Sequence, residues 1–286
     1  MSNTSGDQGN RHPRGSAGPH GADGAGGTAG LAGKRVLITG GTRGLGREIV
    51  RLLAGEGVRV ATCARGEGDL RALRAALGGP EPDRLLTRAL DLTEPERLED
   101  FVAAAAKRFS GLDGVVACAG GSRGRGLEES GADDWAAAWE LNVHHAVRLV
   151  RAAVPHLRAA GGGSVVLVSS ISGWKPGPYA QYGTAKAAQI HLAASLAREL
   201  GPDGIRVNAV SPGSMLIPGR RWDRMRREEP EAYAAFAAAE LPAGEPVAPQ
   251  EVARVVAFLL SDWSSGISGA HLPVVRAQNA PSPDGY

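Results

Sequence analysis

The strongest constraint on the fold is an apolar run that leads into a glycine-rich turn and then into a helical pattern. Residues 35–39, Arg-Val-Leu-Ile-Thr, have the composition of a short buried strand, and the turn that follows is Gly40-Gly-Thr-Arg-Gly-Leu-Gly46. Apolar residues then recur with helical spacing through Leu53. Glycines permit a tight turn and close backbone approach, and a helix N-terminus presents free N–H groups. The segment is therefore predicted to hold the phosphates of a dinucleotide.

Two other structures are consistent with such a turn. A P-loop would end in Gly-Lys followed by Ser or Thr, whereas this stretch continues as Gly46-Arg-Glu. A turn that only links a strand to a helix is the simpler alternative, and the motifs further along the chain argue against it.

Strand-like and helix-like stretches alternate along the rest of the chain. The strands are expected near residues 35–39, 58–63, 84–90, 113–118, 164–169, 205–210 and 271–275, with helical patterns between them. This order predicts an α/β fold, a Rossmann-like, doubly wound seven-stranded parallel sheet with helices on both faces, in a single domain with a small helical lid. The ligand crevice of such a sheet lies at the carboxyl ends of its strands.

Tyr182 and Lys186 lie four residues apart, in Tyr182-Gly-Thr-Ala-Lys186, at the start of a long helical pattern. On a helix this spacing places both side chains on one face, where the ammonium group would lower the pKa of the phenol. A tyrosine of this kind can exchange a proton with an alcohol or carbonyl near neutral pH. Alone, the pair is equally consistent with a solvated helix surface, so its meaning depends on the other motifs.

The ordered set Thr39-Gly40-x-x-x-Gly44-x-Gly46, Asn142, Ser170 and Tyr182-x-x-x-Lys186 resembles the short-chain dehydrogenase/reductase family, in particular its bacterial NADP-dependent 3-oxoacyl-reductase-like members. The resemblance extends over residues 34–280, and the complete set is far more specific than any one motif. It implies reversible hydride transfer between a nicotinamide and a carbonyl or secondary alcohol.

The resemblance assigns catalytic roles to four residues. Tyr182 would exchange the proton, Ser170 would hydrogen-bond the substrate oxygen, and Lys186 would tune the phenol and hold the nicotinamide ribose. Asn142 would hold a water that links Lys186 to solvent, although a plain polar core residue is the alternative at that position. Ser169, adjacent to Ser170, would point to the opposite side of its strand.

The second expected strand indicates which dinucleotide is bound. It ends at Arg65 without a carboxylate for the adenosine ribose 2′-hydroxyl, and an arginine at that point suits a 2′-phosphate. Arg43 in the glycine turn could reach the same phosphate from the other side, so NADP(H) is the predicted cofactor. The alternative is that both are ordinary exposed arginines in an arginine-rich chain.

By the same resemblance, Asp91 would bind the adenine amine beside the Leu92 backbone, and Pro212-Gly213 would hold the nicotinamide. The predicted cofactor-binding set is Gly40, Thr42, Arg43, Gly44, Leu45, Gly46, Arg65, Asp91, Leu92, Cys118, Ala119, Gly120, Tyr182, Lys186, Pro212, Gly213 and Met215.

Three segments depart from the family pattern. Ala117-Cys-Ala-Gly120 stands where the family usually has Asn-Asn-Ala-Gly, so a side chain that braces the neighbouring strand is missing. Ile217 replaces a threonine for the nicotinamide carboxamide, a role for which Ser214 or the Met215 N–H is expected to substitute. At the end of the last expected strand the chain reads Pro273-Val-Val-Arg-Ala277, where relatives commonly carry Asp-Gly. None of these changes removes a proton-transfer group.

Residues 214–246 are predicted to form the lid. Their apolar and aromatic side chains would close over an apolar, aromatic or β-ketoacyl-type substrate, or simply pack the lid onto the body. Five arginines between positions 220 and 227 could meet a carboxylate or a phosphopantetheine, but neighbouring acidic residues favour a solvated helix face. The Ala-, Arg- and Gly-rich composition is similar to that of proteins from GC-rich bacteria, where similar proteins act in fatty-acid, polyketide or other secondary metabolism.

The remaining composition excludes several classes of function. The chain has 286 residues and a formal charge of +2, and no apolar run approaches the length of a membrane-spanning helix. Nucleic-acid and membrane partners are therefore not expected. Two cysteines, Cys63 and Cys118, are expected inside buried strands, without a disulfide or metal site. With no apolar leader at the N-terminus, the predicted location is cytoplasmic.

The predicted organisation is a disordered Gly-rich tail over residues 1–32, a catalytic domain over 33–280 and a C-terminal tail over 281–286. The resemblance implies a homodimer or homotetramer. Two alternatives for the function stay open: an epimerase or dehydratase-like enzyme that uses the cofactor without net redox change, and a catalytically silent NADPH sensor. The complete set of catalytic residues argues against the sensor, and most epimerases have a longer substrate domain.

Overall fold

The computed structural model describes residues 30–78, 84–177 and 179–278. The predicted C-terminal tail lies outside the described residues, as does the predicted N-terminal tail up to residue 29. Of the last three residues of that segment, Leu31 is buried in the core and only 2% exposed.

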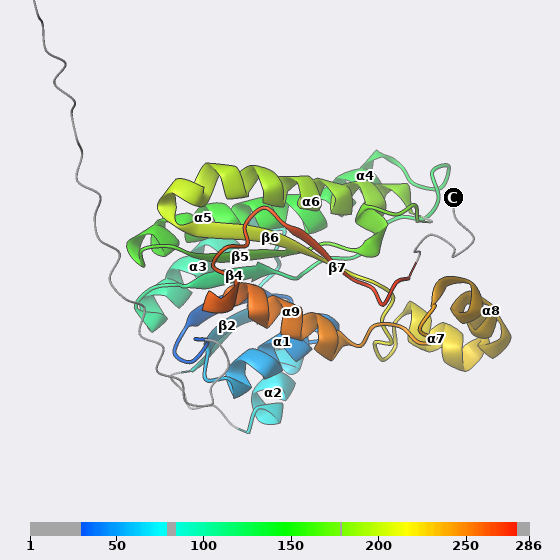
Figure 1. Ribbon diagram of the computed structural model, residues 1–286, viewed down its shortest axis with the longest axis horizontal. Helices are drawn as coiled ribbons and strands as arrows, with labels where there is room; N and C mark the ends of the chain where they lie inside the picture. The colour runs from blue at the N-terminus through cyan, green and yellow to red at the C-terminus, as the bar shows by residue number, and fades with distance from the viewer. Residues whose placement is uncertain (1–29, 79–83, 178, 279–286) are drawn as a thin grey trace, which may run out of the picture.

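A seven-stranded parallel sheet forms the centre of the described chain (Figure 1). Its strands are β1 (Arg35–Thr39), β2 (Arg59–Ala64), β3 (Leu85–Ala89), β4 (Gly114–Ala117), β5 (Gly163–Val168), β6 (Ile205–Pro212) and β7 (His271–Val274). The strand order is β3-β2-β1-β4-β5-β6-β7, and every neighbouring pair is parallel. The predicted fold class is confirmed, and each strand ends within two residues of its predicted bounds. One correction concerns Cys118, which follows β4 instead of lying within it.

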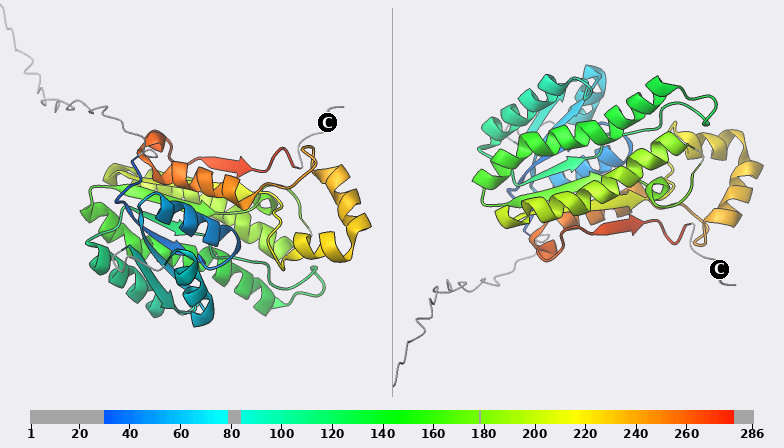
Figure 2. Two further views of the ribbon diagram at one scale, coloured as in Figure 1. Left: turned by 90° about the horizontal axis from the view of Figure 1, so that it is seen from below. Right: turned by 90° about the horizontal axis from the view of Figure 1, so that it is seen from above.

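Helices cover both faces of the sheet (Figure 2). They are α1 (Gly44–Gly55), α2 (Glu67–Ala76), α3 (Pro95–Phe109), α4 (Ala132–Trp139), α5 (His145–Ala159), α6 (Ala180–Leu200), α7 (Arg221–Glu228), α8 (Pro230–Glu240) and α9 (Pro249–Leu260). One buried cluster joins α3, α5 and α6 to the sheet, and a second joins α1, α2 and α9 to its other face. Because both faces are covered, the central strands are apolar at nearly every position. The strand order reverses between β1 and β4, which places the crevice of this fold at their carboxyl ends.

Helices α7 and α8 project beyond the carboxyl edge of the sheet (Figure 1). Their aromatic side chains face one another, with the Trp222 and Phe236 rings stacked 3.9 Å apart and Tyr233 tilted beside Phe236. The segment is thus a helical pair held together by its own aromatic residues, which favours the packing role over the substrate-lining role for those side chains.

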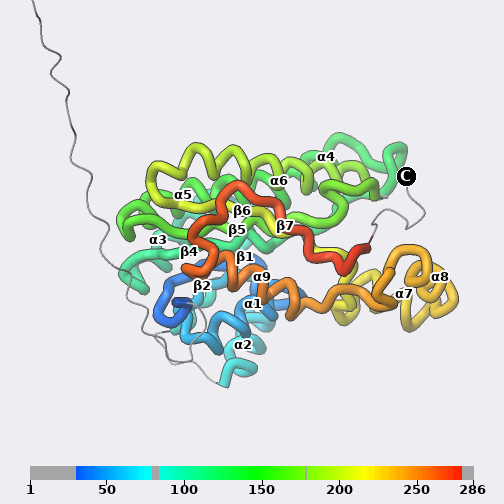
Figure 3. The backbone as a smooth tube through the Cα atoms, viewed as in Figure 1, coloured from blue at the N-terminus to red at the C-terminus, as the bar shows by residue number. Residues whose placement is uncertain are grey.

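The chain that follows β7 runs beside the start of this helical pair (Figure 3). Gln278 accepts a hydrogen bond from the Ser214 N–H at 2.7 Å and donates one to the Ser214 hydroxyl at 2.9 Å. Arg276 forms ion pairs with Glu245 and Glu251 at the approach to α9. Residues far apart in the sequence therefore fix the segment that carries Pro212 and Gly213.

Candidate active site

The glycine turn between β1 and α1 is shaped for close backbone approach. Gly40 and Gly44 have φ values of +75° and +53°, a region that glycine adopts without strain. A Cβ atom at Gly46 would lie 2.2 Å from the Gly40 carbonyl oxygen, and one at Gly41 would lie 2.2 Å from the Thr62 hydroxyl. Gly41 was absent from the predicted set, although its place in the run of glycines was a visible signal.

The N-terminus of α1 is open to an anion. Arg43 occupies the position before the helix without a side-chain capping bond, and the first turn contains no acidic residue. The first N–H groups of a helix have no partner within the helix, and its dipole favours negative charge at that end. The turn therefore has the features of a phosphate site.

Thr39 supplies the brace that the altered fourth-strand motif lacks. Its hydroxyl accepts hydrogen bonds from the N–H groups of Cys118 and Ala119, each at 3.2 Å. The loop after β4 is thereby held against β1 without the family's asparagine, and the backbone of Ala119 remains beside Gly40.

Three arginines gather beside the turn, and we call them the arginine cluster: Arg43, Arg65 and Arg220. Desolvation, followed by repulsion from the charges of Arg220 and Arg65, lowers the pKa of Arg43, while Asp69 raises it. Arg220 comes from the lid segment, whose Ile217 side chain would lie 3.2 Å from a Cβ atom on Gly44. The sequence prediction treated Arg220 as part of a solvated helix face and so did not include it.

Asp91 lies close to the same cluster. Its carboxylate accepts hydrogen bonds from the Thr93 N–H at 3.0 Å and the Thr93 hydroxyl at 2.9 Å. The backbone hydrogen bond is the main cause of a lowered pKa, and the charges of Arg65 and Arg123 add to it. Asp91 and Arg65 line a cavity of about 300 Å³ with residues from the end of β3 and the start of α3. Two of the predicted adenosine contacts, Arg65 and Asp91, thus line one cavity.

The reaction centre, which we define as Asn142, Ser170, Tyr182 and Lys186, lies where β5 ends and α6 begins. Ser170 lies two residues beyond the end of β5. Tyr182 and Lys186 occupy one face of α6, with the ammonium 5.7 Å from the centroid of the phenol ring. Gly120 approaches from the end of β4, because a Cβ atom there would lie 2.7 Å from Asn142 Oδ1 and 3.0 Å from Lys186 Nζ. The four predicted residues are therefore brought together.

The electrostatics of Tyr182 differ from the expectation. Its ring is partly exposed, yet desolvation of the hydroxyl raises its pKa, and a hydrogen bond from Ser170 opposes that rise. The ammonium of Lys186 does not hydrogen-bond the phenol but donates to the Val168 carbonyl at 2.9 Å and to Gln189 Oε1 at 2.8 Å. The expected lowering of the phenol pKa by Lys186 is therefore not found in this structure.

Asn142 lies in a short π-helix, Glu140–His144, between α4 and α5. Its Nδ2 donates to the Ala138 carbonyl at 2.8 Å and to the Gly121 carbonyl at 2.9 Å, while Oδ1 accepts from the Gly121 N–H at 3.1 Å. A widened helical turn of this kind often marks a functional site. The amide ties the loop after β4 to the helix that faces Lys186.

Ser214 is held in place by Gln278. Both its hydroxyl and its N–H are engaged by Gln278, and the residue is 6% exposed. These contacts occupy the Ser214 N–H but not the proton of its hydroxyl, so that hydroxyl and the Met215 N–H both stay predicted substitutes for the missing threonine.

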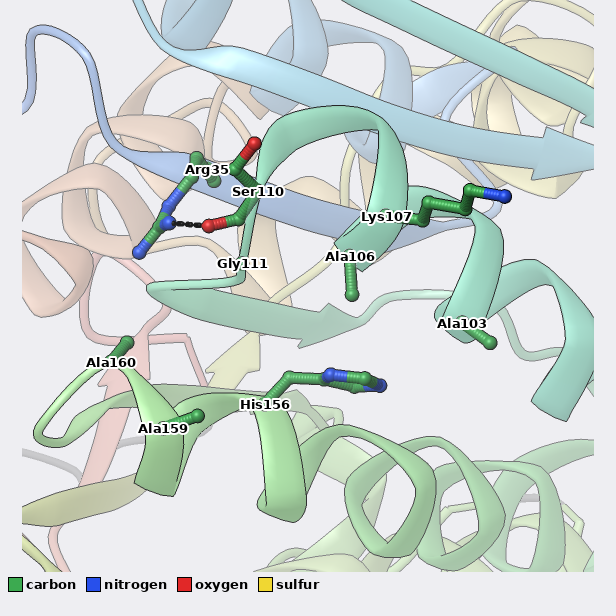
Figure 4. A pocket seen from close by; sticks show the side chains of 9 residues that line it. All are labelled: Arg35, Ala103, Ala106, Lys107, Ser110, Gly111, His156, Ala159 and Ala160. Atoms are coloured by element: carbon green, nitrogen blue, oxygen red, sulfur yellow. Dashed lines mark hydrogen bonds between the residues drawn. The ribbon is translucent and has the colours of Figure 1, made fainter.

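A second cavity, of about 320 Å³, lies at the other end of the sheet (Figure 4). Arg35 at the start of β1 and His156 near the end of α5 line it, together with residues of α3. Since the predicted site residues are at the carboxyl ends of the strands, this cavity is not part of the candidate site. Among the described residues, no group of acidic, His or Cys side chains could hold a metal ion, and no helix could span a membrane.

Fold and site together define an oxidoreductase of the dinucleotide-binding α/β class, and comparisons with known proteins agree. The family profile described as enoyl-(acyl carrier protein) reductase matches residues 40–275. Isoepoxydon dehydrogenase patN of Penicillium expansum is 34% identical over 246 residues, which cover 85% of this chain and 93% of that protein. The 3-oxoacyl-(acyl-carrier-protein) reductase FabG of Escherichia coli strain K12 is 32% identical over 243 residues, 85% of this chain and 96% of that protein.

A solved structure extends the similarity to three dimensions. L-Sorbose reductase from Gluconobacter frateurii, complexed with NADPH and L-sorbose, superposes with a TM-score of 0.78 at 31% identity, covering 86% of this chain and 96% of the other. The chain belongs to the short-chain dehydrogenase/reductase family.

Proposed function

We propose that this oxidoreductase uses NADP(H) and reduces a carbonyl group to a secondary alcohol. The observation that carries the proposal is the grouping of Ser170, Tyr182 and Lys186 at the end of β5, next to a glycine turn with an open helix N-terminus. The glycine turn after β1 and the residues after β5 lie at the same edge of the sheet. A dinucleotide bound at the turn would therefore extend toward the Tyr182 phenol.

The residues present fit a dinucleotide. Gly41 and Gly46 have no room for a Cβ atom, and the first N–H groups of α1 lack a capping side chain. Pro212-Gly213 and the Met215 N–H would hold the nicotinamide, and Asp91 would hold the adenine. The arginine cluster favours NADP(H) over NAD(H), because guanidinium groups bind a 2′-phosphate through charged hydrogen bonds. The sorbose reductase, whose structure contains NADPH, supports this choice by similarity.

A nicotinamide bound at this site would supply the hydride. Tyr182 gives its phenolic proton to the substrate oxygen, and positioned acid catalysis of this kind contributes roughly a hundredfold to ten-thousandfold. Burial raises the pKa of the phenol, so Tyr182 is protonated at neutral pH and carries the proton that the acid role requires. The Ser170 hydroxyl hydrogen-bonds the same oxygen and orients it.

The substrate class is proposed from the surroundings and the relatives. The names of the relatives include a 3-oxoacyl group, isoepoxydon and L-sorbose, which are chemically diverse. We favour an apolar, aromatic or β-ketoacyl-type carbonyl compound of bacterial secondary metabolism, reduced by a cytoplasmic homodimer or homotetramer. Because the aromatic residues of the lid contact one another, substrate contacts would come from residues nearer to Ile217 and the loop after β4.

The decisive experiment measures NADPH and NADH oxidation against a panel of ketones, quinones and β-ketoacyl thioesters. Turnover with at least one panel member and a preference for NADPH would support the proposal. Tight NADPH binding without turnover of any member would favour the sensor. Rearrangement or dehydration of a hydroxylated substrate with no net change in cofactor absorbance would favour the epimerase or dehydratase-like enzyme.

A further inference from the structure

The ammonium of Lys186 is held from within the protein. Two of its three protons go to interior acceptors, the Val168 carbonyl at 2.9 Å and Gln189 Oε1 at 2.8 Å. Gln189 lies three residues beyond Lys186 on α6 and is fully buried. A glutamine on this inner face is chemically unusual, because a buried amide must find partners for both its oxygen and its nitrogen.

Three buried polar atoms near Lys186 are incompletely satisfied. Gln189 Nε2 and both ring nitrogens of His145 make no hydrogen bond of ordinary geometry with a described residue, although a weaker contact with the Leu141 backbone partly opposes the lowering of the His145 pKa. His145 begins α5, is fully buried, and lies near enough to Lys186 to sense its charge. Because buried polar groups almost always have partners, such a group of atoms indicates bound water.

The groups that face Lys186 offer it no negative charge. They are the Cys118 thiol at the end of β4, the Tyr182 phenol on α6 and the His145 imidazole on α5. Burial raises the pKa of Cys118 to about 12 and raises that of Tyr182, while it lowers the pKa of His145 to about 4. All three are thus neutral near pH 7, and the ammonium depends on neutral acceptors.

We propose that Gln189 and His145, joined by buried water, form an interior anchor that keeps the Lys186 ammonium charged and in place. Gln189 Oε1 accepts from the ammonium, and water links Gln189 Nε2 to the acceptor nitrogen of the neutral imidazole. In this arrangement Gln189 is a positioning residue that acts on proton transfer through Lys186. The expected change in the pH dependence of activity rests on the proposed function. The expected buried water and the neutral His145 do not.

The kinetic test compares Gln189→Leu with Gln189→Glu. Burial lowers the pKa of Lys186 to about 8, so activity that needs the ammonium declines as pH rises through that value. Gln189→Leu removes an acceptor and should move this decline about one pH unit toward acid, because a hydrogen bond to a charged group has that order of strength. Gln189→Glu adds a negative charge and should move it toward alkali.

Opposite shifts at one position would not arise from a merely structural role. The matched control is Gln181→Leu, because Gln181 is also a buried glutamine of α6 but donates to the Arg123 and Arg125 carbonyls instead. Its pH profile should keep the wild-type alkaline decline even if its melting temperature falls. Shifts of equal sign in both Gln189 variants, or no shift in either, would overturn the anchor.

A structural test needs no turnover. A high-resolution crystal structure of the full chain should show water between Gln189 Nε2 and His145, and Gln189→Leu should lose it. In histidine-labelled protein, the NMR signals of His145 should report one neutral tautomer at every pH between about 5 and 8. Absence of the water in the wild type overturns the anchor whatever the enzyme assay shows, and absence of turnover alone refutes only the proposed function.

Discussion

The charged groups at the two ends of the crevice differ in their exposure to solvent. The arginine cluster places three guanidinium groups on exposed residues at the rim, where like charges repel but water and salt screen them. The reaction centre instead encloses a single ammonium, 3% exposed, among neutral groups. Charges at an exposed rim are suited to attracting an anionic ligand, whereas burial shifts the pKa values of groups such as Lys186 and Tyr182.

Tyr182→Phe tests the buried end most directly. The change removes only the hydroxyl, so NADPH should bind almost normally while hydride transfer falls by at least about two orders of magnitude. Single-turnover NADPH oxidation and a fluorescence titration would measure the two quantities. Lys186→Met is the companion variant, expected to lose rate and also affinity. Turnover of a competent carbonyl substrate by Tyr182→Phe at the wild-type rate would mean that the proton donor is misassigned.

The buried imidazole of His145 should make the free energy of unfolding depend on pH. Burial lowers the pKa of His145 from 6.5 to about 4. Between these two pH values the imidazole is protonated in the unfolded chain and neutral in the folded chain. Stability should therefore be unaffected above about pH 6.5 and fall by about 3 kcal/mol as pH drops to 4. Urea unfolding of wild type and His145→Gln across this range would show the loss only in the wild type.

The adjacent His144 provides the control for this measurement. Its side chain is 54% exposed and contacts Glu140, so His144→Gln should keep the wild-type acid dependence. If His145→Gln loses as much stability in acid as the wild type does, the imidazole is not buried in its neutral form.

The contrast between the two ends also explains what the sequence could reveal. The glycine turn, the seven strands and the Tyr182–Lys186 spacing follow from local periodicity, and the structure reproduces them. The partner of Ser214 does not follow from local periodicity. Gln278 is 64 residues from Ser214, and only packing brings them together.

Two polar residues near the motifs could have been noticed in the sequence. Gln189 falls on the same helical face as Tyr182 and Lys186, and His145 lies three residues after Asn142. Both are polar residues on an inward face, which indicates a special environment but not its geometry. Arg220 could not be assigned, because its approach to Arg43 depends on the path of the chain after β6.

Arg65→Asp tests the exposed end. It replaces a proposed phosphate ligand with a repelling charge, and each lost charged hydrogen bond costs about 1.5–3 kcal/mol. NADPH affinity should therefore fall at least about tenfold, while NADH affinity changes little. Calorimetric titration of both cofactors measures this, with Arg71→Asp on an exposed position of α2 as the control of equal charge change. A wild-type protein that prefers NADH would refute the phosphate assignment.

Arg220→Ala should have the smallest effect on cofactor affinity. It tests whether the lid segment contributes to binding of the 2′-phosphate. If Arg220 is a third cation that contacts the 2′-phosphate, its loss should lower NADPH affinity severalfold. The effect is expected to be small because the contact is partly solvated and screened by salt. NADH should be unaffected, and added salt should narrow the difference between variant and wild type. Arg224→Ala, one helical turn further along α7 and exposed, should bind both cofactors like the wild type. Equal weakening of NADPH and NADH by Arg220→Ala would instead mean that the residue supports the fold of the lid, because only a contact with the 2′-phosphate distinguishes the two cofactors.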